Sequence, residues 1–249
     1  MSQRGRVEVE IGHKRVRVMF SGTVVADTRE PRLVWEKPYY PTYYFPAADV
    51  RRGLLVPTGD SERSPSRGDA DRMTLRVGDR DAEGGVGHRP TSPLEELVDT
   101  YTFDWTAMDH WFEEDEEVFV HARDPYKRID ALRSSRHVRV EIDGVGVANS
   151  SSGVVLFETS LPPRHYVPKT DVRMDMLIPS RTETSCPYKG VARYWSVQTG
   201  TSLHPDVVWG YDAPLAESAA IAGLVCFYDE RVDSWVDGVA QDRPQTAFS

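Results

Sequence analysis

Hydrophobic and polar residues alternate with a period of two in two stretches of the chain, residues 16–20 and residues 138–142. This period is typical of a β-strand with one buried and one exposed face. Each stretch is followed by a pair that favours a tight hairpin turn, Ser21-Gly22 in the first and Asp143-Gly144 in the second. More continuous apolar runs at 33–36 and 154–158 predict strands that are more buried.

The two stretches belong to an internal repeat at an offset of 122 residues. Without any gap, about 19 of the 63 positions in 16–78 agree with 138–200, and glycines and prolines are prominent among them. Because glycine and proline constrain backbone geometry, their coincidence predicts one fold used twice. We expect a diverged N-terminal repeat over 1–132 and a C-terminal repeat over 133–249, joined through residues 126–136.

After Gly78 and Gly200 the predicted correspondence breaks. We expect a polar loop of about 18 extra residues in the first repeat, with Trp105 as the counterpart of Trp209. The only segments with helical potential are 107–117 and 214–221, and both are short. The fold class predicted is therefore mainly β, with antiparallel strands and a few short helices.

Composition and charge narrow the classes of function. A net charge of −9 argues against a nucleic-acid partner, which requires a basic surface. No apolar run approaches the length needed to cross a bilayer, and residues 1–14 lack the apolar core of a signal peptide. Two cysteines do not make a disulfide framework. We therefore expect a cytoplasmic protein without a membrane or nucleic-acid partner; its oligomeric state is not predicted.

Four runs in the second half are recognisable together: FETSLPPRHYVPKTDVRMD from Phe157, TSCPYKG from Thr184, YWSV from Tyr194 and IAGLVCFY from Ile221. They resemble the domain-of-unknown-function family numbered 427, which also carries a nucleotidyltransferase-like label. The first repeat is similar to a diverged copy of the same domain, so the resemblance covers nearly the whole chain.

The resemblance implies a β-tent (Mss4-like) architecture, shared with methionine sulfoxide reductase B and with the thalidomide-binding domain of cereblon, but it implies no known reaction. Many tent domains hold zinc with paired C-x-x-C motifs. None occurs here, so we expect no zinc and predict no particular cofactor. The sequence also lacks a P-loop, a dinucleotide fingerprint and the carboxylate pair of a nucleotidyltransferase.

The strongest candidate for chemistry is Cys186, in the run Cys-Pro-Tyr-Lys-Gly. A tight turn at this run would hold the thiol near a loop surface, with the cation of Lys189 close enough to favour the thiolate. The alternative is that Cys186 packs as a small hydrophobic residue. In the first repeat Ser64 and Arg67 stand at these positions, which suggests that the turn persisted while the chemistry was lost.

Glu158 ends a strand that is predicted to be buried, so its carboxylate needs a partner, for which Arg173 and Lys189 are the candidates. It is either an acid or base of the site or a structural ion pair. Asp171 and Asp49 precede Val-Arg in both repeats, which favours a capping or turn role for these carboxylates.

The second repeat also contains a dense aromatic set that either binds a ligand or forms the core. Its members are Tyr166, Tyr194, Trp195, Trp209 and Tyr211. Cys226 lies in an apolar run and is expected to be buried and inert. His110 and Glu114 would share one face of a helix, but the acidic residues around them favour a solvated surface over a metal site.

Together these features predict a small-molecule site in the second repeat around Cys186, Lys189, Glu158 and the aromatic set. The enzyme hypothesis makes Cys186 a nucleophile, Lys189 its electrostatic activator and Glu158 an acid or base. The alternatives are a non-catalytic module that binds a small ligand, and an interaction scaffold that uses the acidic segment 113–117.

Overall fold

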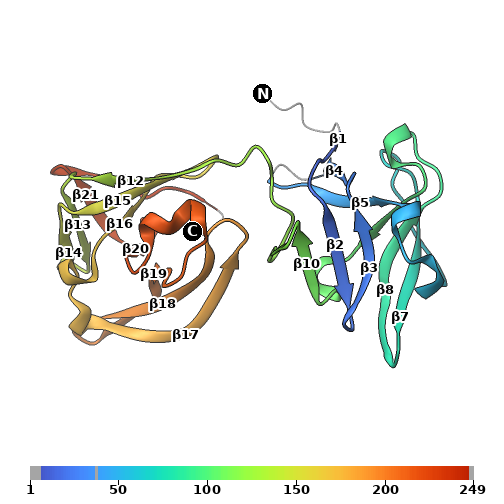
Figure 1. Cartoon of the computed structure of the whole chain (residues 1–249). Coiled ribbons are helices and arrows are strands. Elements are labelled where there is room, and N and C mark those ends of the chain that lie inside the picture. The colour runs from blue at the N-terminus through green and yellow to red at the C-terminus, as the bar shows by residue number, and fades with distance from the viewer. Residues whose placement is uncertain (1–6, 37–38, 247–249) are drawn as a thin grey trace. The chain divides into compact units, whose positions relative to one another are not determined.

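The computed structural model describes residues 7–36 and 39–246, and these form two compact units, 1–124 and 125–249 (Figure 1). The division lies before the expected position at 132, because β12 (Ile129–Ser134) pairs along its whole length with β15 (Gly153–Glu158). Residues 129–134 therefore belong to the second unit instead of to a connector.

The first unit consists of two antiparallel sheets. The larger has the order β1 (Glu8–Ile11), β4 (Arg32–Trp35), β5 (Thr42–Pro46), β9 (Thr100–Phe103), β8 (Arg80–Arg89), β7 (Ala70–Val77), β6 (Leu55–Glu62). The smaller has the order β11 (Glu116–Glu117), β10 (His110–Glu113), β2 (Val16–Phe20), β3 (Thr23–Thr28).

The second unit repeats this arrangement in three antiparallel sheets. The first has the order β12, β15, β16 (Arg164–Tyr166). The next has the order β14 (Val145–Ser150), β13 (Val138–Ile142), β21 (Asp233–Val236), β22 (Val239–Ala240). The third has the order β17 (Leu177–Cys186), β18 (Gly190–Thr199), β19 (Ser202–Gly210), β20 (Val225–Phe227).

The mainly β fold predicted from the sequence is confirmed, and the helical segments among the described residues are short 3-10 turns. Both predicted hairpin turns form. Ser21 and Gly22 have φ angles of 50° and 70°, and Asp143 and Gly144 have 53° and 75°. Positive φ at both central positions is the signature of the turn that matches the twist of a hairpin. No helix among the described residues is long and apolar enough to cross a membrane.

The correspondence between the repeats extends further along the chain than the sequence predicted. Residues 80–89 form β8, which pairs with β7 just as β19 pairs with β18, still at the offset of 122. The prediction of a loop of about 18 extra residues here was therefore wrong. Gly78 and Asp79 form the hairpin turn, and the rest of the polar run belongs to β8. The counterpart of Trp209 is Gly87, not Trp105.

The helix expected over 107–117 was also wrong. Residues 105–107 form one 3-10 turn, and β10 and β11 then make a tight hairpin around Glu114, whose φ is 51°. Trp111 and Glu113 are buried in alternation with more exposed neighbours, which is the period of a strand. The segment 214–221, which was expected to be helical, contains the short 3-10 helix η7 (Ala216–Ile221).

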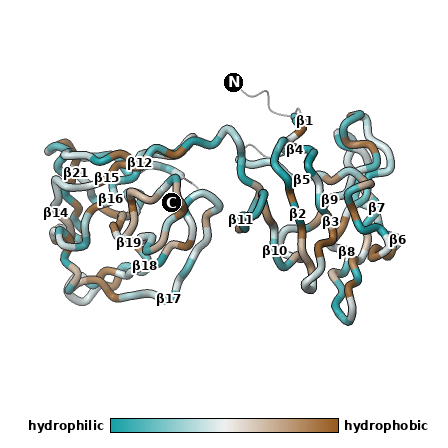
Figure 2. The backbone as a smooth tube through the Cα atoms, in the orientation of Figure 1, coloured by the Kyte–Doolittle hydropathy of each residue, from teal (hydrophilic) through white to brown (hydrophobic). Residues whose placement is uncertain are grey.

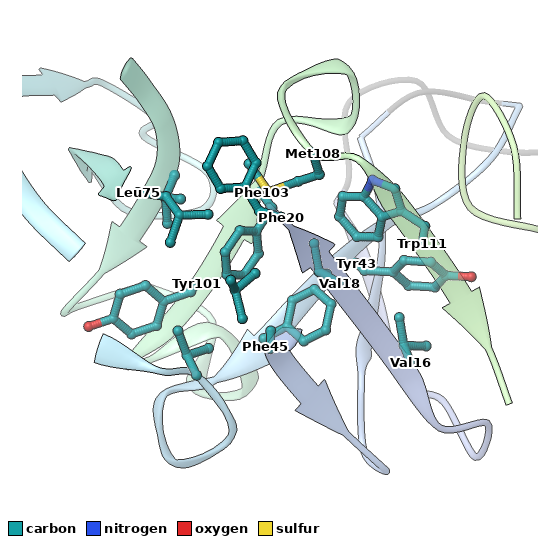
Figure 3. Packing of buried hydrophobic residues seen from close by; sticks show 14 of the residues in the cluster. Val16, Val18, Phe20, Tyr43, Phe45, Leu75, Tyr101, Phe103, Met108 and Trp111 are labelled. Atoms are coloured by element: carbon teal, nitrogen blue, oxygen red, sulfur yellow. The ribbon is translucent and has the colours of Figure 1, made fainter. Parts of the chain in front are cut away.

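Each unit has its own hydrophobic core. In the first unit, aromatic and aliphatic side chains from β2, β5, β9 and β10 point toward one another around Phe45 and Trp111 (Figure 3). Hydrophobic and hydrophilic stretches alternate along the backbone of both units (Figure 2). In strands such as β2, fully buried residues alternate with partly exposed ones, so one face packs on the core while the other meets solvent.

Candidate functional site

The candidate site of the second unit is built where β15 ends and where the turn between β17 and β18 begins. In this unit β12 and β15 lie on one side, and β17 and β18 lie on the other (Figure 1). Glu158 is the last residue of β15, and Lys189 stands in the turn that follows Cys186. The two segments converge through the fold, although 31 residues separate them in the chain.

Glu158 is held between two lysines. The ammonium of Lys189 donates to its Oε2, and Nζ of Lys127 lies 4.0 Å from its Oε1. All three side chains are largely buried, with exposed fractions of 7% for Glu158, 12% for Lys189 and 13% for Lys127. Of the two partners predicted for Glu158, Lys189 is the one observed.

Arg173, the other predicted partner, lies elsewhere. It precedes the 3-10 turn η6 (Met174–Met176) and forms an exposed ion pair with Asp175 at 2.7 Å. Lys127 was missed by the sequence reasoning because it stands in the segment interpreted as a connector. Its Nζ also donates to the carbonyl oxygen of Thr159, at 3.0 Å, which fixes it beside the end of β15.

Cys186 ends β17 and pairs across the hairpin with Gly190. Cys186 is partly exposed, whereas Cys226, within β20, is 1% exposed. Burial raises the pKa of the Cys226 thiol well above its ordinary value, as expected for an inert cysteine. The cation of Lys189 is directed to Glu158, so its proposed role toward Cys186 stays a prediction.

Four of the five aromatic residues singled out in the sequence meet in one buried cluster together with Cys226. They are Tyr166, Tyr194, Trp209 and Tyr211. Trp195 does not join them. Because neighbouring residues of a strand point to opposite faces, Trp195 leaves β18 on the other side and packs against the second core cluster of this unit, under Nζ of Lys169 at 4.9 Å.

Hydroxyl groups line the cluster. The Tyr194 hydroxyl lies 2.8 Å from Oγ1 of Thr184 and 3.5 Å from the hydroxyl of Tyr228. Trp209 donates its indole N–H to the Tyr166 hydroxyl at 3.1 Å. Burial raises the pKa of the Tyr211 phenol, and the neighbouring Cys186 and Tyr194 add to the rise, so this phenol stays protonated. The cluster thus holds neutral hydroxyl groups inside the core of the second unit, where the four aromatic residues are at most 7% exposed.

Arg164 fixes the other end of the cluster. It forms ion pairs with Glu230 at 2.5 Å and with Asp229 at 3.3 Å, and its guanidinium lies 5.6 Å from the Trp209 ring centroid. Burial raises the pKa of Asp229 despite this partner. Sequence reasoning missed Arg164, although the run PPRHY that contains it was quoted for the family resemblance.

The first unit keeps the ion pair but changes its surroundings. Arg67, at the position of Lys189, lies 2.8 Å from Glu36 and donates to the Tyr44 hydroxyl at 2.9 Å. Tyr44 donates in turn to Glu36 at 2.7 Å. Ser64 replaces Cys186 and is buried. The retained pair supports the structural interpretation of the Glu158 position, since it persists where the cysteine does not.

Other sequence candidates are distributed outside this site. Asp49 accepts a hydrogen bond from Thr28, and Asp171 accepts one from Ser150, both at 2.6 Å. These bonds give both carboxylates a structural role, but they tie the 3-10 turns to a neighbouring strand and do not cap them, because neither turn has a side-chain cap. His110 pairs with Glu117 at 2.6 Å across a hairpin instead of with Glu114 along a helix. Among residues 7–36 and 39–246, no group of three or more His, Cys, Asp or Glu side chains is placed to hold a metal ion.

The acidic segment 113–117 is only partly a solvated face. Glu113 is 4% exposed and accepts hydrogen bonds from Lys14, at 2.6 Å, and from Tyr43. Glu114 and Asp115 are exposed, but Arg17 contacts both, donating to the carbonyl oxygen of Glu114 and forming an ion pair with Asp115 at 2.7 Å.

Two β-rich units with the same strand neighbours and the same ion pair define a tandem-repeat protein. The sequence profile described as Domain of unknown function (DUF427) matches residues 8–114 and again residues 130–238. The chain therefore belongs to the DUF427 family and contains two tandem copies of its domain. A search of curated proteins found no match.

Proposed function

We propose that the second unit binds a small anionic molecule at the pair of lysines around Glu158. One observation carries this proposal: two ammonium groups face a single carboxylate, and all three side chains are at most 13% exposed. A charge that is poorly solvated and not neutralised is costly, so a site with one excess positive charge favours an anionic ligand.

The aromatic cluster supports the same proposal as a buried apolar wall near Glu158. Small-ligand sites combine apolar walls with a few polar groups that fix orientation. Tyr211 and Tyr194 belong to the cluster, and the charge of Glu158 contributes to the raised pKa of Tyr211. An anion that carries an aromatic ring would satisfy both the ammonium pair and the phenols.

The non-catalytic binding module is the form of this proposal that the contacts favour, because Lys189 is already paired with Glu158. The antiparallel sheets support the β-tent architecture that the family resemblance implies. The net charge and the two free cysteines support a cytoplasmic location.

The test is a calorimetric titration of the full chain with 4-hydroxybenzoate. We expect saturable binding that Lys127→Met weakens at least about tenfold, because a hydrogen bond to a charged group is lost. Lys169→Met is the matched control, since it removes the same charge from a half-exposed site of the same unit. Equal affinities of the two variants, or no saturable binding to the wild type, would contradict the proposal.

Thiol-dependent chemistry at Cys186 is the second candidate, favoured by the contrast between the partly exposed Cys186 and the buried Cys226. In the wild type and in Cys226→Ala, iodoacetamide should alkylate Cys186 in the native state, its thiolate sulfur displacing iodide. Lys189→Met should slow this labelling. Without the Lys189 cation the negative charge of Glu158 is less balanced, and this disfavours the thiolate form of Cys186. If Cys186 labels only after unfolding, thiol chemistry is excluded and the binding module remains.

A further inference from the structure

The first unit has charged side chains at three positions where the second unit has hydroxyl groups. Glu62 stands in the place of Thr184, Arg72 in the place of Tyr194 and Arg89 in the place of Tyr211, all at the offset of 122. These residues come from the neighbouring strands β6, β7 and β8. The diverged repeat has therefore exchanged a neutral polar site for an ionic one.

Glu62 lies among three guanidinium groups without a close contact to any of them. Its carboxylate oxygens are 3.6 Å from Arg67, 3.8 Å from Arg72 and 3.9 Å from Arg89. These distances allow electrostatic attraction, but they exceed the length of a hydrogen bond. The Glu62 side chain is 46% exposed, so it lies at the surface of the cluster.

Arg89 is the unusual member of the cluster. Its side chain is only 2% exposed, and its guanidinium carbon lies 5.0 Å from the centroid of the Tyr44 ring. Among the described residues, neither its Nε nor its Nη1 has a hydrogen-bond acceptor. A buried guanidinium that lacks acceptors is costly, and its planar donors match the oxygens of a carboxylate or phosphate.

The other two arginines are held in place by their own partners. Arg67 is fixed by Glu36 and by the Tyr44 hydroxyl, and Arg72 forms an ion pair with Asp104 at 2.5 Å. Nη1 of Arg72 also lies next to Gly87: a Cβ atom added to Gly87 would be 3.5 Å from Nη1. Anchored guanidinium groups lose little conformational entropy when an anion arrives.

We propose that the first unit binds a small oxyanion, a carboxylate or a phosphate group, which replaces the Glu62 carboxylate among Arg67, Arg72 and Arg89. Glu62 occupies the site as an internal substitute and competes with the ligand. The first repeat is then a second binding site with its own specificity, separate from the site proposed around Glu158.

The experiment titrates the full chain with inorganic phosphate and, in a second series, with succinate, at constant ionic strength maintained with sodium chloride. Glu62→Gln removes the competing charge and should bind one of the two anions about tenfold more tightly than the wild type. The matched control is Glu83→Gln, which removes the same charge from an exposed position of β8 and should leave the affinity unchanged. The anion that binds identifies the preferred group.

Two further variants separate this site from its alternatives. Arg72→Gln, made in the Glu62→Gln background, should abolish the gain, whereas Lys127→Met in the second unit should not affect it. The proposal is overturned if Glu62→Gln shows no saturable binding of either anion, which would mean that solvent satisfies Arg89. It is equally overturned if Glu83→Gln matches the gain of Glu62→Gln, because the effect would then be one of net charge.

Discussion

At the scale of single residues, burial decides what each titratable group does. Glu158 and Arg164 are both largely buried, and each is paired with opposite charges that come from other segments of the chain. The pairing of Glu158 with Lys189 could be predicted, because a carboxylate at the end of a buried strand requires a cation. The contribution of Lys127 could not, since only the folded backbone brings residue 127 beside residue 158.

Burial of His165 should make the free energy of unfolding depend on pH. Burial lowers the pKa of His165, and the charge of Arg136 lowers it further, while Asp237 opposes both. The unfolded chain therefore binds this proton at a higher pH than the folded chain. The free energy of unfolding should fall as the pH drops from about 6.5 through the folded pKa, and then fall no further on account of His165.

Denaturant titrations at several pH values between 7 and 5 measure this dependence. The fall should be shallower in His165→Gln, while His13→Gln, which alters an exposed histidine of the first unit, serves as the control. Identical pH dependence in His165→Gln and in the wild type would show that burial of this ring does not influence stability.

At the scale of elements, the period of two explains both the successes and an error of the sequence reasoning. It predicted β2 and β13 with their hairpins, because alternation in a strand is local. The same alternation places Trp195 and Tyr194 on opposite faces of β18, so the aromatic set could not meet as one group. The many charged residues at 113–117 made this segment resemble an exposed helix, so β10 was not predicted. The buried face of β10 is formed by Trp111 and Glu113.

Two glycines make different demands on these elements. Gly144 needs its positive φ but has open space around it, so Gly144→Ala should cost about 1 kcal/mol of the free energy of unfolding. At Gly210 a Cβ atom would lie 2.5 Å from the backbone oxygen of Leu224, where β20 approaches β19. Gly210→Ala should therefore cost at least about 2 kcal/mol. Urea denaturation measures the free energy of unfolding of both variants. Equal losses of stability in the two variants would contradict the close backbone approach at Gly210.

At the scale of the whole molecule, the chain consists of two units that each bury a core of their own. Each unit also repeats the same hairpins, 3-10 turns and ion pair. A segment that contains a complete core is expected to fold alone. Residues 1–124 and 125–249, expressed separately, should each unfold cooperatively and keep near-ultraviolet circular dichroism. A molten or aggregated half would show that its core is completed by the other unit.

The sequence by itself determined the repeat, the mainly β fold class, the hairpin turns and the family. These depend on local periodicity and on glycine and proline geometry, which each stretch of chain expresses without the rest. Only the tertiary structure decided which side chains meet. The register between β7 and β8 shows that the first repeat has no insertion after Gly78, and strand packing gathers Glu62 with its three arginines. Contacts between distant segments depend on pairing partners and on strand faces, and a single sequence does not specify these locally.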